Sequence, residues 1–133
     1  MSRGRLFWGI IALLISLTGC SSKEEQPSDN DIESFGKYVS GTLPYQMKKI
    51  AADNGSKPML VMYLHGGSSK GNDNETQMKE AAVNVINEYL SDNSIPSIFI
   101  VPQCPSTGSW GAKMNESLAN LIGEYEDSCD GVY

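Results

Sequence analysis

The residues best suited to do chemistry lie where an apolar run ends in a histidine and two glycines. Residues 59–64 read Met-Leu-Val-Met-Tyr-Leu, which suits a buried strand, and His65, Gly66 and Gly67 follow directly. Glycine adopts backbone angles that other residues avoid and lets another molecule approach the main chain closely. Converging backbone N–H groups stabilise the negative oxygen that forms during acyl transfer. We therefore expect Gly66 and Gly67 to present their N–H groups to an acyl oxygen.

A polar loop follows these glycines, and its residue types suit a brace for the loop. Asp73 and Asn74 favour the N-terminal positions of helices, and Gln77 comes three residues later. The stretch closely resembles the oxyanion loop of the α/β-hydrolase fold, in its carboxylesterase, phospholipase and predicted-peptidase group. That loop reads His-Gly-x-Gly-x-x-Gly-x-Asp-Asn-x-x-Gln, and here Ser68 stands at its usual second glycine. We expect Asp73, Asn74 and Gln77 to support the loop and to cap the helix after it.

A second loop extends the resemblance. Residues 101–105 read Val-Pro-Gln-Cys-Pro and Trp110 follows, which is similar to the Pro-Gln-Cys-Pro…Trp segment of the same hydrolases. Together the matches cover roughly residues 43–133. The resemblance implies that Trp110 forms a wall of the acyl or leaving-group pocket, although an ordinary half-buried aromatic residue fits the sequence equally well.

No catalytic nucleophile is expected in this chain. In the fold that it resembles, the nucleophile lies in a Gly-x-Ser-x-Gly elbow between a strand and a helix, and the acid and histidine come later. The stretch Gly67-Ser-Ser69-Lys-Gly71 matches that pattern literally, but three polar residues separate it from the predicted helix. His65 is the sole histidine, and we interpret it as a structural hydrogen-bonding residue of the loop. Val132 and Tyr133 resemble the first residues of the strand that leads to the elbow.

Hydrophobic spacing predicts the strands that carry these loops. Leu43, Tyr45 and Met47 alternate with other residues, which indicates a short, half-exposed strand. Residues 59–64 are apolar throughout, as in strands that are covered on both faces, and Ile95 with residues 98–101 indicates another buried strand.

Helical spacing follows both loops. Apolar residues recur every three or four positions over residues 75–90 and again from 114 to 125. Strands that alternate with helices predict an α/β fold with a mixed or parallel sheet and flanking helices. With the resemblance, this is the N-terminal part of an α/β-hydrolase sheet, incomplete, over residues 41–133. Because both loops follow strands, we expect them at one edge of the sheet.

The start of the chain has the pattern of an export signal. Arg3 and Arg5 precede an apolar run over residues 6–17, and Leu-Thr-Gly-Cys20 resembles the bacterial lipobox. We predict a lipoprotein signal peptide over residues 1–19, lipidation at Cys20, and a polar acidic tether over residues 20–40. The protein would then be held by its lipid in a bacterial cell envelope, periplasmic or at the cell surface. An uncleaved signal anchor with an incidental cysteine is the alternative.

Charge and cysteine content narrow the partners. Without residues 1–19, which contain two arginines, the chain has eight Lys and Arg and sixteen Asp and Glu, a net charge of −8. This acidity argues against nucleic acid as a partner. One histidine and scattered cysteines give no zinc set, and no cofactor is expected. Cys104 and Cys129 form a disulfide or remain two buried thiols, and the sequence does not choose between them.

These observations favour the N-terminal portion of a secreted serine hydrolase. It would act on carboxylic esters, with thioesters and amides as related substrates, and would take a small-molecule or lipid ester as its partner. The chain would supply the oxyanion loop and lack the nucleophile, acid and base, so alone it is expected to be inactive. The alternative is a non-catalytic lipoprotein module that binds a ligand with the same loops.

Overall fold

The computed structural model describes residues 34–133. The predicted signal peptide, the lipidation site at Cys20 and the tether up to residue 33 lie outside the described residues. The predicted tether ended at residue 40, but Gly36–Ser40 form the first strand, so the folded part begins earlier than residue 41. None of the helices within residues 34–133 has the length and apolar character needed to cross a bilayer.

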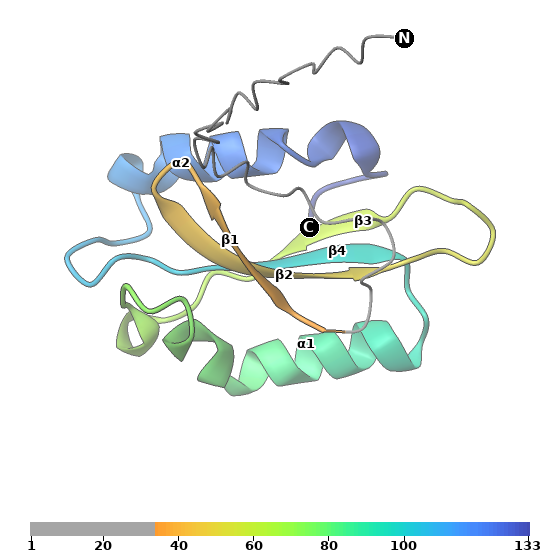
Figure 1. The fold of residues 1–133 in the computed structure, drawn as a ribbon, viewed down its shortest axis with the longest axis horizontal. Coiled ribbons are helices and arrows are strands. Elements are labelled where there is room, and N and C mark those ends of the chain that lie inside the picture. The colour runs from red at the N-terminus through yellow and green to blue at the C-terminus, as the bar shows by residue number, and fades with distance from the viewer. Residues whose placement is uncertain (1–33) are drawn as a thin grey trace, which may run out of the picture.

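A four-stranded mixed sheet forms the middle layer, with the order β1-β2-β4-β3 (Figure 1). β1, β2 and β4 pair antiparallel, and β3 pairs parallel with β4. The parallel pair needs a crossover, which contains a helix, as in other α/β domains. The strands are β1 (Gly36–Ser40), β2 (Leu43–Ile50), β3 (Met59–Met62) and β4 (Ser97–Pro102).

The expected half-exposed strand is an inner strand of the sheet. Leu43, Tyr45 and Met47 are buried as predicted, but Gln46, which lies between them, is also only 8% exposed. β2 lies between β1 and β4 and has layers on both faces, so alternation in the sequence underestimated its burial. The side chain of Gln46 is satisfied there because its Nε2 donates to the carbonyl of Asn74 at 2.6 Å.

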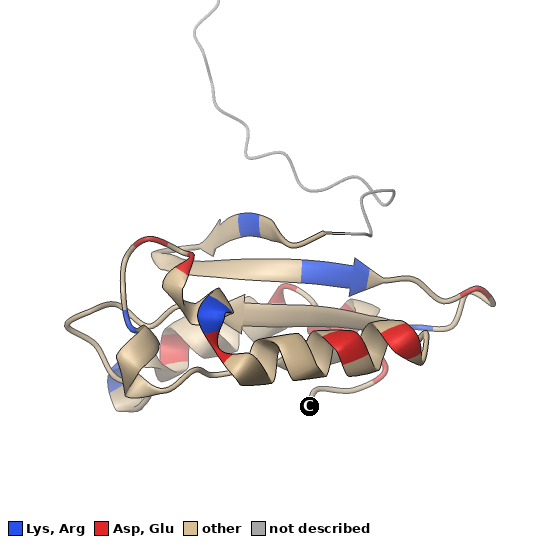
Figure 2. Ribbon diagram, turned by 90° about the horizontal axis from the view of Figure 1, so that it is seen from below, with Lys and Arg blue, Asp and Glu red and all other residues tan. Residues whose placement is uncertain are grey.

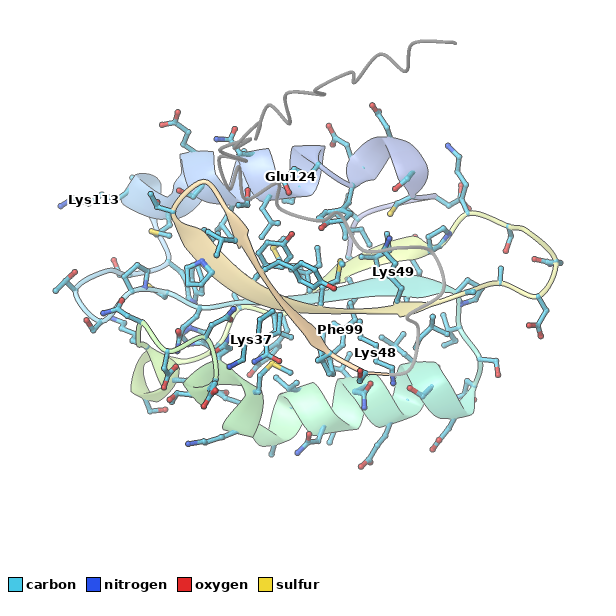
Figure 3. All side chains as sticks on the ribbon, viewed as in Figure 1. Lys37, Lys48, Lys49, Phe99, Lys113 and Glu124 are labelled. Atoms are coloured by element: carbon cyan, nitrogen blue, oxygen red, sulfur yellow. The ribbon has the colours of Figure 1, made fainter. Side chains whose placement is uncertain are left out.

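One helix covers each face of the sheet (Figure 1). Ile98 and Ile100 of β4 pack in the core on the side of α2 (Ala112–Gly123), which contributes the fully buried Leu121. Phe99 and Val101 pack on the other side, against α1 (Ala81–Asp92). Figure 3 shows Phe99 between the sheet and α1. Successive side chains of β4 therefore pack alternately into the two cores, as its continuously apolar sequence predicted.

The helix expected over residues 75–90 begins later and in two pieces. Thr76–Lys79 form a 3₁₀-helix, Glu80 has extended backbone angles, and α1 starts at Ala81. The second predicted helix is present as α2. The segment after it contains a further short 3₁₀-helix at Glu126–Ser128.

The last described residues run beside β3 as a parallel neighbour. The N–H of Leu60 donates to the carbonyl of Gly131 at 2.8 Å, and the N–H of Tyr133 donates to the carbonyl of Leu60 at 2.8 Å. The N–H of Met62 donates to the carbonyl of Tyr133 at 2.9 Å. This segment thus adds to the sheet on the β3 side, as the strand-like character of Val132 and Tyr133 predicted.

Acidic and basic residues are distributed differently over the layers. Figure 2 shows Asp and Glu over the helices and connecting segments, and lysines there and also on β1 and β2. Lys48 of β2 is held between the layers, since its Nζ donates to Asn87 Oδ1 at 2.9 Å and to Ser91 Oγ at 3.0 Å on α1. On the other face, the hydroxyl of Ser40 at the end of β1 donates to the carboxylate of Glu124 (Figure 3).

Candidate functional site

His65 follows β3 closely and joins the two loops of interest. Its ring is 2% exposed. Nδ1 donates to the carbonyl of Gly66 at 2.6 Å, and Nε2 accepts the N–H of Cys104 at 2.9 Å. Because Nε2 must be unprotonated to accept this bond, the ring is the neutral Nδ1–H tautomer. Both ring nitrogens are occupied by backbone groups, which suits a residue that shapes the loops rather than one that moves protons.

Trp110 closes the second loop over His65. Its indole N–H donates to the carbonyl of His65 at 2.8 Å, and the two rings meet edge to face with centroids 5.2 Å apart. Trp110 is partly buried and packs against the α2-side core. These contacts fix the indole ring beside the glycine turn, where the resemblance implied a pocket wall.

The two glycines differ in what their N–H groups do. Gly66 and Gly67 are both exposed, and a methyl group added at Gly67 would meet nothing within 4 Å. The N–H of Gly66 donates to Glu80 Oε1 at 3.2 Å. The N–H of Gly67 has no acceptor among residues 34–133. Of the pair expected to hold an oxyanion, Gly67 therefore has the available donor.

Glu80 accepts hydrogen bonds from three parts of the site. Besides Gly66, its Oε1 accepts the hydroxyl of Ser69 at 2.6 Å, and its Oε2 accepts the hydroxyl of Tyr63 at 2.8 Å. The Ser69 hydroxyl, followed by that of Tyr63, holds the pKa of the Glu80 carboxyl below its ordinary 4.5. Sequence reasoning missed Glu80, because it lies inside the region predicted as one helix and no spacing rule singles it out.

Ser69 has no imidazole beside it that could take its proton. Its hydroxyl donates to a carboxylate that is already satisfied by other donors, and its residue is 6% exposed. Both nitrogens of His65 are engaged by backbone groups. A serine nucleophile is activated by a base that readily takes its proton, usually a histidine, and the lowered pKa of the Glu80 carboxyl makes that carboxylate a poor base. The arrangement therefore agrees with the interpretation that the literal Gly-x-Ser-x-Gly match is not a nucleophile elbow.

Asp73 anchors the far end of the first loop. Its Oδ1 accepts the N–H groups of Glu75 and Thr76, each at 3.0 Å, and its Oδ2 accepts the hydroxyl of Thr76 at 2.6 Å. Gln103 of the second loop also donates to Oδ1, at 2.7 Å. These four donors, the Thr76 hydroxyl first, hold the pKa of the Asp73 carboxyl well below its ordinary value. Asp73 lies just before the 3₁₀-helix that starts at Thr76.

Asn74 connects the loop to β2, and its amide is fully used. It has a positive φ of 50°, which asparagine tolerates better than most residues. Its Nδ2 donates to the carbonyl of Tyr45 at 3.0 Å, and its Oδ1 accepts Gln77 Nε2 at 2.7 Å. Its own N–H donates to Gln103 Oε1 at 2.7 Å. The Asn74 side chain thus fastens the loop to the sheet.

Two buried glutamines complete the brace. Gln77 is fully buried and donates to Asn74, while its Oε1 has no partner within the described residues. Gln103, also fully buried, binds Asp73 and Asn74 through its two amide ends. Gly71 passes so close that a methyl group there would lie 2.8 Å from Gln103 Nε2. Gln103 was noted as part of a motif without a role, and its position directly after a buried strand is the signal that could have assigned one.

The structure thus brings the expected site residues together from two loops at one edge of the sheet. His65, the glycines, Asp73, Asn74 and Gln77 come from the first loop, and Trp110 comes from the second. Cys104 and Cys129 are buried and not bonded to each other. Residues 34–133 contain no group of three or more His, Cys, Asp or Glu that could hold a metal ion.

Comparison with known proteins relates this architecture to an esterase. No protein-family model matches the sequence, and no curated protein matches it. A solved structure described as a thermostable esterase matches with a TM-score of 0.53 and 21% sequence identity. The match covers 75% of this chain and 32% of the esterase chain, so this chain corresponds to about a third of that longer protein. The described residues therefore form a partial α/β domain with a hydrolase-like fold.

Proposed function

We propose that this chain supplies the oxyanion loop of a secreted serine hydrolase that acts on carboxylic esters, with thioesters and amides as related substrates. The observation that carries the proposal is the exposed N–H of Gly67, which has no acceptor within residues 34–133. This N–H lies on a loop that is held in place by the hydrogen bonds of His65, Glu80 and Asn74. Donors that are fixed before the reaction stabilise developing charge without a cost of reorganisation.

The proposed role covers one part of the reaction. A serine would attack the ester carbonyl, a histidine would take its proton, and the carbonyl oxygen would become negative. The Gly67 N–H would donate to that oxygen. The nucleophile, acid and base are assigned to no residue of this chain, and the substrate would be a small-molecule or lipid ester.

Replacing Gly67 with proline tests the donor. Proline lacks the N–H but is tolerated at the first position of a helix, which Gly67 occupies in the short 3₁₀-helix Gly67–Ser69. The preceding Gly66 has φ −73° and ψ 174°, angles that proline accepts in the residue before it. Gly67→Ala keeps the N–H and is the matched control.

The assay uses p-nitrophenyl acetate and the protein expressed from residue 20 with any coding sequence that follows the Tyr133 codon. We expect Gly67→Pro to lower kcat by about 10²–10³-fold, the usual effect of losing one oxyanion donor, and Gly67→Ala to stay near wild type. Equal activity of the two variants, at equal melting temperature, would contradict the proposal.

The second candidate is a non-catalytic lipoprotein module that binds a ligand. It is favoured by His65, whose two ring nitrogens are both bonded to backbone groups, so that within the described residues no serine or cysteine side chain is paired with an imidazole. Sequencing the gene beyond the Tyr133 codon separates the two. A Gly-x-Ser-x-Gly stretch within a few codons supports the hydrolase, and a stop codon at that point supports the binding module.

Membrane attachment through a lipid at Cys20 is part of the same proposal, with a cell-envelope location and no nucleic-acid partner. It is supported by the Leu-Thr-Gly-Cys20 sequence and the acidic charge. Palmitate labelling that is lost in Cys20→Ala, together with release of that variant from the membrane fraction, is the expected result. Equal labelling of both proteins would refute the lipid anchor.

A further inference from the structure

Glu80 has an unusual use for a residue that precedes a helix. Its backbone belongs to both neighbouring elements, since its N–H donates to Gln77 and its carbonyl accepts the N–H of Val83 at 3.0 Å. A side chain at this position commonly caps its own helix, but Glu80 makes no such bond to α1. Its carboxylate turns instead to the glycine turn, residues 66–69.

The carboxylate is suited to this contact because its three partners there all donate. Oε1 accepts the Gly66 N–H at 3.2 Å and the Ser69 hydroxyl at 2.6 Å, and Oε2 accepts the Tyr63 hydroxyl at 2.8 Å. An ionised carboxylate accepts at both oxygens and donates at neither. The contacts join the segment after β3, the glycine turn and the start of α1 through one side chain.

We propose that Glu80 is a positioning residue for the glycine turn: its carboxylate engages the Gly66 N–H and holds the turn so that Gly67 offers its N–H to a substrate oxygen. The second half of this statement rests on the proposed function, whereas the first half concerns the turn only. A segment with two successive glycines has many accessible conformations, so a fixed turn needs a partner outside itself. Glu80 provides that partner from the position directly before α1.

The titration of Glu80 gives a signal that general loss of structure would not produce. Tyr63 and His65 are the titratable groups that face it, and the Ser69 and Tyr63 hydroxyl groups lower its pKa below 4.5. The amide proton shift of Gly66 in the labelled full-length protein should therefore follow an inflection below pH 4.5. Tyr63→Phe or Ser69→Ala removes a donor and should raise that inflection toward the ordinary value.

Three variants, two at Glu80 and one on α1, complete the design. Glu80→Gln keeps the shape and one accepting oxygen, so the Gly66 signal should remain near its wild-type position without the inflection. Glu80→Ala should shift and broaden the signals of residues 66–69. Glu88→Ala, which removes an exposed carboxylate from the same helix, should change neither. A flat Gly66 titration in the wild type, or an inflection that persists in Glu80→Gln, would overturn the proposal.

An activity measurement separates this inference from the proposed function. In a protein that hydrolyses p-nitrophenyl acetate, Glu80→Ala should lower kcat by about tenfold to a hundredfold with little change in KM, and Glu80→Gln should restore most of it. An unchanged kcat in Glu80→Ala would refute the substrate-directed half. If the wild type is inactive but the NMR results hold, the proposed function fails while the role of Glu80 in the turn stands.

Discussion

Asp73 makes the stability of the loop depend on pH. Four donors hold its pKa below the ordinary 3.8, so the unfolded chain binds a proton at higher pH than the folded chain. The stabilisation is therefore complete above the ordinary pKa and is lost as the pH falls below it. We expect the urea concentration at the unfolding midpoint of the wild type to decrease as the pH is lowered below about 4. Asp73→Asn should show a smaller decrease.

Asp53→Asn is the control for this measurement. Asp53 is exposed and accepts no side-chain hydrogen bond within the described residues, so its removal should leave the acid dependence of the midpoint as in the wild type. Parallel pH curves for the wild type and Asp73→Asn would show that the four hydrogen bonds do not favour the charged carboxylate.

The residue types of the first loop indicated which side chains brace it, but they did not indicate the hydrogen-bond partners of those side chains. Asp73, Asn74 and Gln77 were expected to brace the loop and to cap the helix after it, and the structure makes each a hydrogen-bonded member of one network. None of them caps α1, which has no side-chain cap. The partners Gln103 and Glu80 could not be deduced in this way. They reach the loop through folding of the sheet and the start of α1, which local preferences do not encode.

At the scale of elements, the periodicity of apolar residues predicted type better than boundaries. It correctly assigned β4 and α2, because their apolar patterns match the faces they bury. It joined Thr76–Lys79 to α1, because the 3₁₀-helix and the α-helix have similar spacing and the break at Glu80 lies in its backbone angles. A pattern of side chains carries little information on such a break.

The contact between the two loops depends on the absence of a side chain at Gly71. A methyl group there would lie 2.8 Å from Gln103 Nε2, and Gln103 is fully buried with both amide ends engaged. We expect Gly71→Ala to lower the free energy of unfolding by about 1–3 kcal/mol, the cost of leaving buried polar groups without partners. Urea unfolding monitored by circular dichroism measures it.

Gly67→Ala serves as the matched glycine control, because its added methyl group meets nothing within 4 Å. Its free energy of unfolding should stay within about 0.5 kcal/mol of the wild type. If Gly71→Ala were as stable as this control, Gln103 would have room to move away, and the two loops would not be locked together as described.

For the molecule as a whole, the two edges of the sheet differ in the side chains that they expose to solvent. β1 is a short edge strand that carries Lys37, which pairs with Glu75, and lysine on an edge discourages further pairing. At the other end, Gly131–Tyr133 pair with β3 on one side only. The exposed side chains there are apolar, with Val132 46% and Tyr133 74% exposed.

When residues 20–133 are expressed alone, this second edge should make them self-associate. Val132 uses neither its N–H nor its carbonyl to bind β3, so both groups face outward without a partner among residues 34–133. An open edge with apolar side chains recruits strands from other copies, and a lysine placed on it opposes that pairing. We expect the chain expressed from residue 20 to form larger species as its concentration rises in sedimentation velocity, and Val132→Lys to remain monomeric.

Val85→Lys adds the same charge at a 64% exposed position of α1 and should still associate. Loss of association in both variants would assign the effect to net charge, and persistence in both would place the contact elsewhere on the molecule.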